Sequence, residues 1–375
     1  MSRKKILFLS SWYPVEKNPT HGIFVQRHAE AVSMLNDVYV LYLCGGDEIK
    51  HESFLEHSES FIEHIIYYKK IHSSSFNKYR HLKKIYENAF LSILTKWGKP
   101  DLIHLNVIFP VGIFALHLSR MHQIPMLITE HWTGYLPEDG SYQGLIKKYF
   151  TRQVVRHAKA ICPVTKHLAE NMKRHSLTGS YKIVPNVVDT EFFDYHGISE
   201  KNVIVFFHLS SLEERQKNPV SILEAFLKIH DKYNNTKLIF GGDGKNLKEL
   251  EKKYPHHAIE YHYRPMGKVL LQLYQRCDAF VLNSRFENLP VVLLEAMSCG
   301  KAVISSEVGG ISEYISESNG ILFSTPDVVN LCDAMEKYIL TKSNFNPELI
   351  REFAIKHFSK KSISESFDYI YNEIT

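Results

Sequence analysis

Two carboxylates beside an expected helix start offer the clearest chemistry in this chain. Glu287 lies in a polar loop at 283–288, and Glu295 interrupts an apolar run at 291–297. A helix that begins at Pro290 presents free backbone N–H groups and a partial positive charge, which suit a phosphate. At about 100° per residue, Glu295 can point along the helix face nearest the same loop. The alternative is that Glu295 is only the solvent side of an amphipathic helix.

The segments around these acids predict a strand, loop, helix, strand unit. Residues 278–282 are apolar and predict a strand, and residues 291–298 predict a helix with Pro290 at its first position, where its missing N–H costs nothing. Gly300 is typical of a helix end, and residues 301–305 predict the second strand. Such a unit builds a parallel sheet, in which ligands bind outside the carboxyl ends of the strands. The polar loop lies at such an end.

The same alternation of strand and helix runs along most of the chain. Residues 47–100 are the exception, because they are polar, aromatic and poorly punctuated apart from a helix-like stretch that is formed by residues 67–70 and then by residues from Lys78 onward, ending at Trp97. We expect helices at 25–35 and 266–276, and strands at 5–10, 38–43, 101–106, 125–129, 160–165, 202–208, 237–240 and within 256–264. Residues 320–323 and those from 327 onward complete the second half of the chain. The pattern predicts an α/β protein.

Length and composition limit the classes of protein that fit. A chain of 375 residues suits two domains, and its 44% hydrophobic and 23% charged residues are typical of a folded protein. Five cysteines without CxxC spacing indicate buried reduced thiols and no zinc site, and a net charge of +4 argues against nucleic acid as a partner. The apolar run at 6–9 is too short for a signal peptide, and no segment approaches the ~18 apolar residues of a membrane helix. We therefore expect a cytoplasmic protein.

Two stretches in the first half concentrate basic residues. Residues 69–99 contain eight Lys or Arg and one acid, and residues 145–175 again contain eight against one. Both stretches also carry aromatic residues, a combination that suits an anionic membrane surface and a peripheral location at the inner membrane face. The alternative is that both are solvated helix faces.

The segment from Phe286 to Gly310 resembles the E-x7-E motif of retaining, nucleotide-sugar-dependent glycosyltransferases of family 4. The resemblance implies the GT-B fold, an α/β architecture of two Rossmann-like domains with parallel sheets facing across a cleft. It places an acceptor-side domain at 1–178, with a helix at 359–375 packing back on it, and a nucleotide-sugar-binding domain at 179–358. The matching residues are Phe286-Glu287, Glu295-Ala296, Gly300 with the following Lys-Ala-Val-Ile, and Gly309-Gly310.

The resemblance also implies contacts with the sugar and the ribose of a donor. Glu287 would contact the transferred sugar and Glu295 the ribose. His131, which follows the strand at 125–129, would contact the donor sugar. Gly22 would let its loop approach the diphosphate, although a plain turn glycine is the alternative.

Other residues are implied to carry the diphosphate and the base. Ser211 stands where the family commonly has an arginine, and Arg215 either takes over that role or faces solvent. Arg264 ends a strand that should lie near the nucleotide base. The phosphates would be held by Lys217 and by the helix start at Asn288, Leu289 and Pro290.

The implied reaction is the transfer of a sugar from a UDP- or GDP-linked donor to a hydroxyl of a glycan or lipid-linked saccharide acceptor, in cell-surface polysaccharide or glycolipid synthesis. The sequence contains no DxD-like metal motif or Walker loop, so we expect no metal and no cofactor beyond the donor. Two alternatives stay open. One is a sugar-nucleotide epimerase of the same architecture, and the other is a non-catalytic sugar-nucleotide binding protein, which Ser211 favours.

Overall fold

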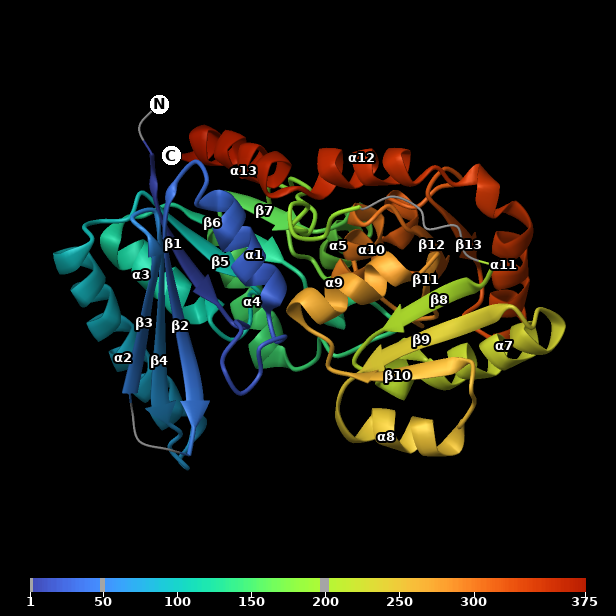
Figure 1. The fold of residues 1–375 in the computed structure, drawn as a ribbon. Coiled ribbons are helices and arrows are strands. Elements are labelled where there is room, and N and C mark those ends of the chain that lie inside the picture. Colours follow the sequence, from blue (N-terminus) through green and yellow to red (C-terminus); the bar gives the residue numbers. More distant parts are fainter. Residues whose placement is uncertain (1–2, 48–50, 196–201) are drawn as a thin grey trace.

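The computed structural model describes residues 3–47, 51–195 and 202–375, and these form two α/β lobes side by side (Figure 1). Each lobe is built on its own sheet, and in each sheet most neighbouring strands are parallel. In Figure 1, the arrowheads of β8 and β9, which mark their carboxyl ends, point toward the first lobe. The predicted α/β fold class with two parallel-sheet lobes is confirmed.

The first lobe contains a seven-stranded sheet in the order β3-β4-β2-β1-β5-β6-β7. Its central strand β1 is apolar and buried on both faces, because Leu7 and Leu9 enter one hydrophobic core while Ile6 and Phe8 enter another. The strands are β1 (Lys5–Ser10), β2 (Asp37–Gly46), β3 (His51–Ser58), β4 (Phe61–Lys69), β5 (Leu102–Asn106), β6 (Met126–Glu130) and β7 (Ala160–Pro163).

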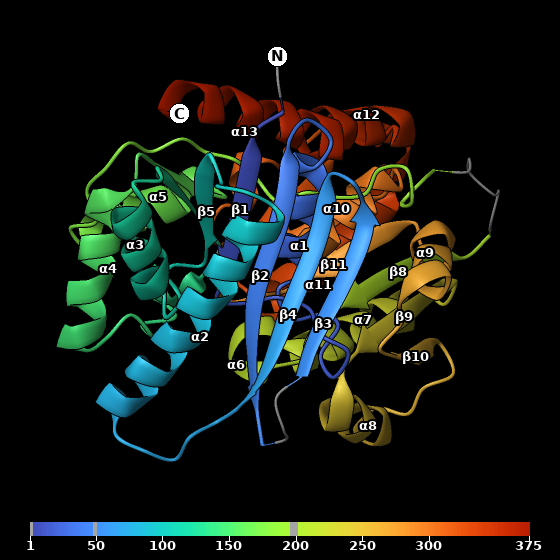
Figure 2. The same ribbon diagram turned by 90° about the vertical axis from the view of Figure 1, so that its left-hand side faces the viewer.

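Helices cover both faces of this sheet. One face carries α1 (Ile23–Val32) and α13 (Lys360–Ile374), which pack against each other. Figure 2 shows α2 (Ser75–Lys96), α3 (Gly112–His122) and α4 (Leu145–His157) together on one side of the lobe. A short 3-10 helix, η1 (Thr133–Tyr135), follows β6, and α5 (Lys166–Arg174) follows β7.

The second lobe contains a six-stranded parallel sheet in the order β10-β9-β8-β11-β12-β13. Its strands are β8 (Ile204–Leu209), β9 (Thr236–Gly242), β10 (Ile259–Tyr263), β11 (Ala279–Leu282), β12 (Ala302–Ser306) and β13 (Gly320–Phe323). Its helices are α6 (Glu214–Lys217), α7 (Pro219–Lys232), α8 (Gly244–Lys253), α9 (Gly267–Arg276), α10 (Val291–Ser298), η2 (Ile311–Glu313), α11 (Val328–Thr341), η3 (Lys342–Asn344) and α12 (Pro347–Phe358).

The structure adds a β3–β4 hairpin that the sequence did not predict. β4 pairs in parallel with β2 from Val38↔Phe61 to Gly46↔Lys69, and β3 pairs antiparallel with β4 at the edge of the sheet. Most of β3 is exposed, so its polar side chains hide the alternation that marks a strand. The first part of the predicted helix-like stretch is wrong, because residues 67–69 belong to β4, where their backbone pairs with β2. The rest is present as α2, with Trp97 as its C-cap.

The predicted boundary at 178/179 falls in the connection between β7 and β8. The Lys182 N–H donates to the Ile161 carbonyl at 2.9 Å, so the chain still runs beside β7 at this point. The last helix, α13, buries Phe367, Ile370 and Tyr371 in the core beneath α1. The exact division between domains stays a prediction. Among the residues that the structure describes, no helix is both long and apolar enough to cross a lipid bilayer.

Candidate active site

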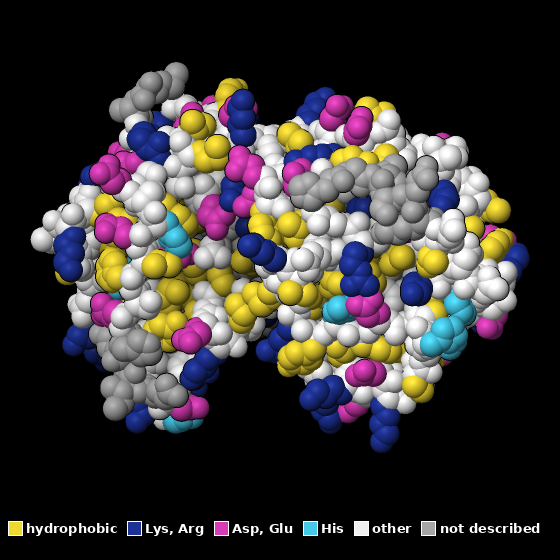
Figure 3. Space-filling model, in the orientation of Figure 1, with side chains coloured by type: hydrophobic (Ala, Val, Ile, Leu, Met, Phe, Trp, Pro, Cys, Tyr) yellow, Lys and Arg dark blue, Asp and Glu magenta, His cyan; other side chains and the backbone are white. Residues whose placement is uncertain are grey.

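Loops from the two sheets meet where the lobes face each other. β6 ends at Glu130 and is followed by His131, while β11 ends at Leu282 and is followed by the loop at 283–290. The Asn288 amide donates to the His131 carbonyl at 2.6 Å, which joins the two loops directly. Figure 3 shows a groove between the lobes on one face, with hydrophobic side chains along it.

Glu287 is held inside the second lobe. Its carboxylate forms an ion pair with Lys217 at the end of α6, and it accepts a hydrogen bond of 2.8 Å from the Ser284 hydroxyl. Only 5% of Glu287 is exposed. Gly309, at φ +60, packs directly on this loop, since a Cβ at Gly309 would lie 1.7 Å from the Glu287 carbonyl oxygen. In the matched Gly309-Gly310 pair, the first residue must therefore be a glycine because it packs on the loop that carries Glu287.

Lys217 reaches Glu287 because its loop is tied to the loop at 283–290. The Arg285 N–H donates to the Gln216 carbonyl at 2.7 Å, and the Gln216 amide donates to the Phe286 carbonyl at 3.2 Å. The Arg285 guanidinium also donates to the Asn218 amide oxygen at 2.7 Å. These bonds fix the lysine relative to the acid within one lobe.

Glu295 is held from both lobes. It accepts the Tyr274 hydroxyl of α9 at 2.9 Å, and it pairs with Arg27 of α1 in the first lobe at 2.6 Å. Only 4% of Glu295 is exposed, and α10 is buried from Leu293 to Ser298. The alternative in which Glu295 is the solvent side of an amphipathic helix is therefore wrong, because α10 is covered by its own sheet and by α12, and Arg27 of α1 reaches the Glu295 carboxylate.

His131 takes part in a hydrogen-bonded bridge between the lobes. The Asn186 amide nitrogen donates to the Leu289 carbonyl at 2.7 Å, so the Asn186 amide oxygen must be the acceptor that faces His131 Nδ1 at 3.0 Å. Nδ1 therefore carries the proton, and Nε2 keeps its lone pair. His131 Nε2 and Asn288 Oδ1 are both buried without a hydrogen-bond partner among the described residues.

The surroundings of His131 keep it neutral and fixed. Burial, reinforced by the nearby His28, lowers the pKa of the His131 imidazole well below its usual value. The Phe24 ring lies 4.3 Å from the His131 ring, centroid to centroid. The Glu130 carboxylate accepts the backbone N–H groups of His131 at 2.9 Å and Trp132 at 3.0 Å, and this sets the turn that presents the imidazole.

Contacts within the chain itself explain why residue 22 is a glycine. Gly22 has φ +76 and precedes α1, and a Cβ there would lie 2.6 Å from the backbone of Trp12 and Tyr13. Any side chain at this position would strain the turn. The role toward a diphosphate stays a prediction.

Two predicted arginines lie outside the cluster around Glu287. Arg215 is exposed, and it donates to the Asp139 carbonyl of the first lobe at 2.6 Å. Arg264 is half exposed and forms a two-pronged ion pair with Asp243, next to the carboxyl end of β9. Arg215 therefore bridges the lobes at the surface. The alternative that it only faces solvent accounts for its exposure but not for its hydrogen bond to the first lobe. Ser211 is exposed in the turn after β8.

Several residues that shape the site were not predicted from the sequence. Arg27 and Tyr274 hold Glu295, Asn186 orients His131, and Glu313 accepts the N–H groups of Lys166 and His167 at the start of α5 across the interface. Each partner is distant in sequence from the group it holds, so spacing gave no signal.

Two family models match the chain. Residues 22–192 match the model described as Glycosyltransferase Family 4, and residues 189–354 match the model described as Glycosyl transferases group 1. The matches adjoin near residue 190 and together take in most of the chain. The opening segment of the first match includes Gly22, and the second contains both Glu287 and Glu295.

Curated relatives extend the likeness over most of the sequence. An uncharacterized glycosyltransferase of Methanocaldococcus jannaschii is 28% identical over 350 residues, which cover 88% of this chain and 93% of that protein. A component of the phosphatidylinositol N-acetylglucosaminyltransferase of Arabidopsis thaliana is 26% identical over 264 residues, or 69% of this chain and 58% of that protein. The match thus spans less than two thirds of the plant relative.

Solved structures share the fold. HepE of Anabaena, solved in complex with UDP, superposes with a TM-score of 0.74 at 16% identity and covers 99% of this chain and 100% of its own. At this identity the likeness concerns the fold. Taken with the two family models, it shows that the chain belongs to glycosyltransferase family 4 and has the GT-B architecture.

Proposed function

We propose that this protein is a retaining glycosyltransferase that moves a sugar from a UDP- or GDP-linked donor to a hydroxyl of a glycan or lipid-linked saccharide. The observation that supports it best is the pair of buried, unpartnered acceptors at the interface, His131 Nε2 and Asn288 Oδ1, beside the Glu287 loop. Buried polar atoms without partners are uncommon and call for an explanation. The hydroxyl groups of a donor sugar would supply the missing hydrogen bonds.

The donor diphosphate is assigned to the second lobe. Lys217 supplies a positive charge, and the start of α10 at Asn288, Leu289 and Pro290 supplies the positive end of a helix dipole and the backbone N–H groups of its residues other than the proline, which has none. A diphosphate would compete with Glu287 for Lys217, which frees the Glu287 carboxylate to accept sugar hydroxyls. Arg215 can add charge at the groove, in place of the arginine missing at Ser211. We assign the stabilisation of the leaving group to these residues, without a metal.

The proposed chemistry conserves the anomeric configuration. The bond between the anomeric carbon and the diphosphate oxygen breaks, and a bond from that carbon to the acceptor oxygen forms on the same face. The acceptor proton passes to the departing nucleoside diphosphate. The site needs no carboxylate nucleophile for this route, and Glu287 then acts by binding the sugar beside the reacting carbon.

The relatives support the choice of donor and acceptor. The structure of HepE holds UDP, and the name of the plant relative gives phosphatidylinositol as its acceptor. We carry both to this chain only as a proposal: a uridine or guanosine diphosphate sugar as donor, and a saccharide on a lipid or a growing glycan as acceptor. This would place the protein in cell-surface polysaccharide or glycolipid synthesis.

The exposed start of α4 supports contact with an anionic membrane. Leu145 is 87% exposed, Ile146 is 74% exposed and Tyr149 is 59% exposed, and Lys147 and Lys148 lie between them. Lysine beside exposed apolar and aromatic groups suits the boundary between headgroups and acyl chains. The loop before α4 contains Asp139, which contacts Arg215 of the second lobe. A membrane-docked α4 would therefore bring a lipid-linked acceptor to the opening between the lobes.

A vesicle assay tests the membrane contact. The protein should sediment with anionic vesicles in low salt, and Leu145→Ser/Ile146→Ser should sediment much less. Val329→Ser, at a position 63% exposed on α11 of the second lobe, is the matched control and should bind like the unaltered protein. Equal sedimentation with neutral vesicles would contradict an electrostatic contact.

A donor panel tests the function itself. The protein is incubated with UDP- and GDP-sugars, each with and without a mixture of lipid-linked and free saccharide acceptors, and the released nucleotide is measured. We expect release that depends on an acceptor. Conversion of the donor sugar without an acceptor would indicate the epimerase, and binding without turnover would indicate the non-catalytic alternative.

A further inference from the structure

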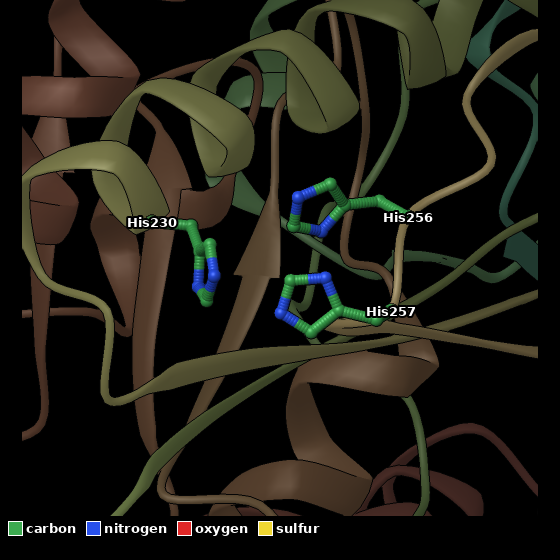
Figure 4. A group of neighbouring side chains, drawn as sticks. All are labelled: His230, His256 and His257. Carbon is green, nitrogen blue, oxygen red and sulfur yellow. The ribbon is translucent and has the colours of Figure 1, made fainter.

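Three histidines meet at the surface of the second lobe, away from the proposed site. His230 comes from the last turn of α7, and His256 and His257 come from the loop between α8 and β10. Figure 4 shows the three imidazoles directed toward one another. Each ring can offer a nitrogen such that the three nitrogens lie within 4.8 Å of one another.

The cluster lies at the opposite end of the second sheet from the proposed active site. His230 precedes β9, which begins at Thr236, and the histidine pair precedes β10, which begins at Ile259. These are the amino ends of two parallel strands, whereas the loop at 283–290 follows the carboxyl end of β11. The cluster therefore lies apart from the proposed site of sugar transfer.

The hydrogen bonds of His230 prepare it to bind a cation. Its Nδ1 lies 3.1 Å from the Thr236 carbonyl, which can only accept, so Nδ1 carries the proton. Nε2 is left with its lone pair. Histidines that bind metals usually donate their other N–H to a carbonyl or carboxylate in this manner, because that fixes both the tautomer and the ring.

The other two rings can adjust at a small cost. His256 Nδ1 accepts the Ala258 N–H at 3.2 Å, and binding a cation through either nitrogen gives up this one long hydrogen bond. His257 is exposed, and its ring packs only against His256 and His230, so its rotation gives up no hydrogen bond that is seen among the described residues. Bonds from zinc to imidazole nitrogen measure about 2.0–2.1 Å, so the rings would have to close by on the order of 1 Å.

We propose that His230, His256 and His257 bind a divalent transition-metal ion of the Zn²⁺ type, with water in the remaining position. Three neutral imidazoles suit zinc, copper and nickel far better than magnesium or calcium, which prefer oxygen. The ion would join the end of α7 to the loop that leads into the edge strand β10. Its role would be to stabilise this edge of the lobe.

The competing explanation is that the rings only pack against one another, edge to face in the two pairs with His230 and tilted between His256 and His257. Their centroids lie 4.4 Å apart for His256 and His257, and 5.1 Å and 5.4 Å for the pairs with His230. Packing of the rings alone predicts no saturable binding of metal and no change in stability when metal is added. The two explanations therefore differ in a direct measurement.

The test uses the full chain without a polyhistidine tag. Zn²⁺ is titrated by calorimetry, and Co²⁺ is titrated by absorption, since its visible bands report nitrogen ligands in a tetrahedral site. We expect one ion per chain and a rise in Tm with added Zn²⁺. His257→Ala and His256→Ala should weaken the binding at least about tenfold and abolish the rise in Tm.

His72→Ala, at an exposed position in the first lobe, is the matched control and should bind one ion like the unaltered protein. The Co²⁺ spectrum of the unaltered protein keeps the proposal testable if a variant fails to fold. The proposal is overturned if the unaltered protein shows no saturable one-to-one binding, or if His257→Ala and His256→Ala both bind as tightly as the control. Sugar transfer should not change with Zn²⁺, so this outcome is separable from that of the donor panel.

Discussion

Glu287 and Glu295 flank the start of α10, yet different parts of the molecule hold them. The partners of Glu287, Lys217 and Ser284, both belong to the second lobe. Glu295 is held by Tyr274 of its own lobe and by Arg27 of the first lobe. Both acids are almost fully buried, so the difference lies in which lobe supplies the charge.

This difference separates two tasks. The side-chain contacts of Glu287 lie within one lobe, although Asn288 ties the same loop to His131 of the first lobe. Its carboxylate therefore depends less on how the lobes approach each other than Glu295 does, which suits a group that must be in place for the chemical step. The position of Glu295 depends on the approach of α1, which suits a group that binds donor as the lobes come together. Variants at the two acids should therefore affect different kinetic parameters.

The largest effect is expected for Glu287→Ala. Loss of a carboxylate that binds the transferred sugar should lower kcat by about 10²- to 10³-fold, the range found when a single preorganised polar group of an active site is removed. Steady-state kinetics with the best donor of the panel measure it, and circular dichroism checks the fold. Glu317→Ala, at an exposed turn of the same lobe, is the control. Near-normal turnover of Glu287→Ala would remove this residue from the site.

The next effect is expected for Glu295→Ala. If Glu295 binds the ribose of the donor, its loss should raise the donor KM by roughly 10- to 100-fold, because a hydrogen bond to a charged group contributes about 1.5–3 kcal/mol. The effect on kcat should be smaller than that of Glu287→Ala. A kcat that falls as far as in Glu287→Ala, with KM unchanged, would erase the proposed distinction between the two acids.

A smaller effect is expected on stability from the ion pair between the lobes. Arg27→Met leaves the Glu295 carboxylate buried beside Tyr274 without its cation, so the free energy of unfolding should fall. A double-mutant cycle with Glu295→Gln should give a coupling of about 1–3 kcal/mol, measured by urea unfolding. Additive effects of the two substitutions would mean that α1 does not hold Glu295 in solution.

The smallest effect is expected on the free energy of unfolding when the pH is lowered. Burial lowers the pKa of His28, next to Arg27 on α1, from 6.5 to about 4, although a backbone hydrogen bond to Pro185 opposes the shift. Below pH 6.5 the unfolded chain binds a proton at His28 that the folded chain does not. This contribution to stability is therefore complete above pH 6.5 and is lost as the pH falls toward 4, by about 1.4 kcal/mol near pH 5.5.

Urea unfolding at pH 7.5 and at about pH 5.5 measures this effect. His28→Gln should be less stable at both values, but it should lose less stability between them than the unaltered protein. The buried His104, His131 and His208 also have lowered pKa values and will add to the total acid sensitivity of both proteins. An equal loss in the two proteins would show that His28 titrates normally in the fold.

Much of the fold could be predicted because its central strands are short apolar runs with clear ends. The strand at 5–10 has the bounds that the sequence predicted, and the helix predicted to start at Pro290 and to end at Ser298 begins one residue later, at Val291. β3 was not predicted, since an exposed edge strand needs few apolar residues. β4 is largely buried between β3 and β2, and its end at 67–69 was instead predicted as part of a helix-like stretch. The place of this hairpin in the sheet depends on β2, whose pairing the sequence does not reveal.

The site could be predicted only where its residues are near in sequence or belong to the motif. The helix start at Pro290 and the two acids follow from one continuous segment. The partners of those acids do not, because Arg27 and Glu295 are 268 residues apart and meet only when both lobes are folded. The three surface histidines are another case, since no ligand spacing links His230 to the pair at 256–257.

The most direct test of the central claim, that a nucleotide sugar binds between the lobes at these residues, is calorimetry with UDP and GDP. We predict that one of the two binds with one site per chain to the unaltered protein, and at least about tenfold more weakly to Lys217→Met and Glu295→Gln. The Glu317→Ala control should bind as the unaltered protein does. Failure of both nucleotides to bind, or equal affinity for all four proteins, would contradict the account.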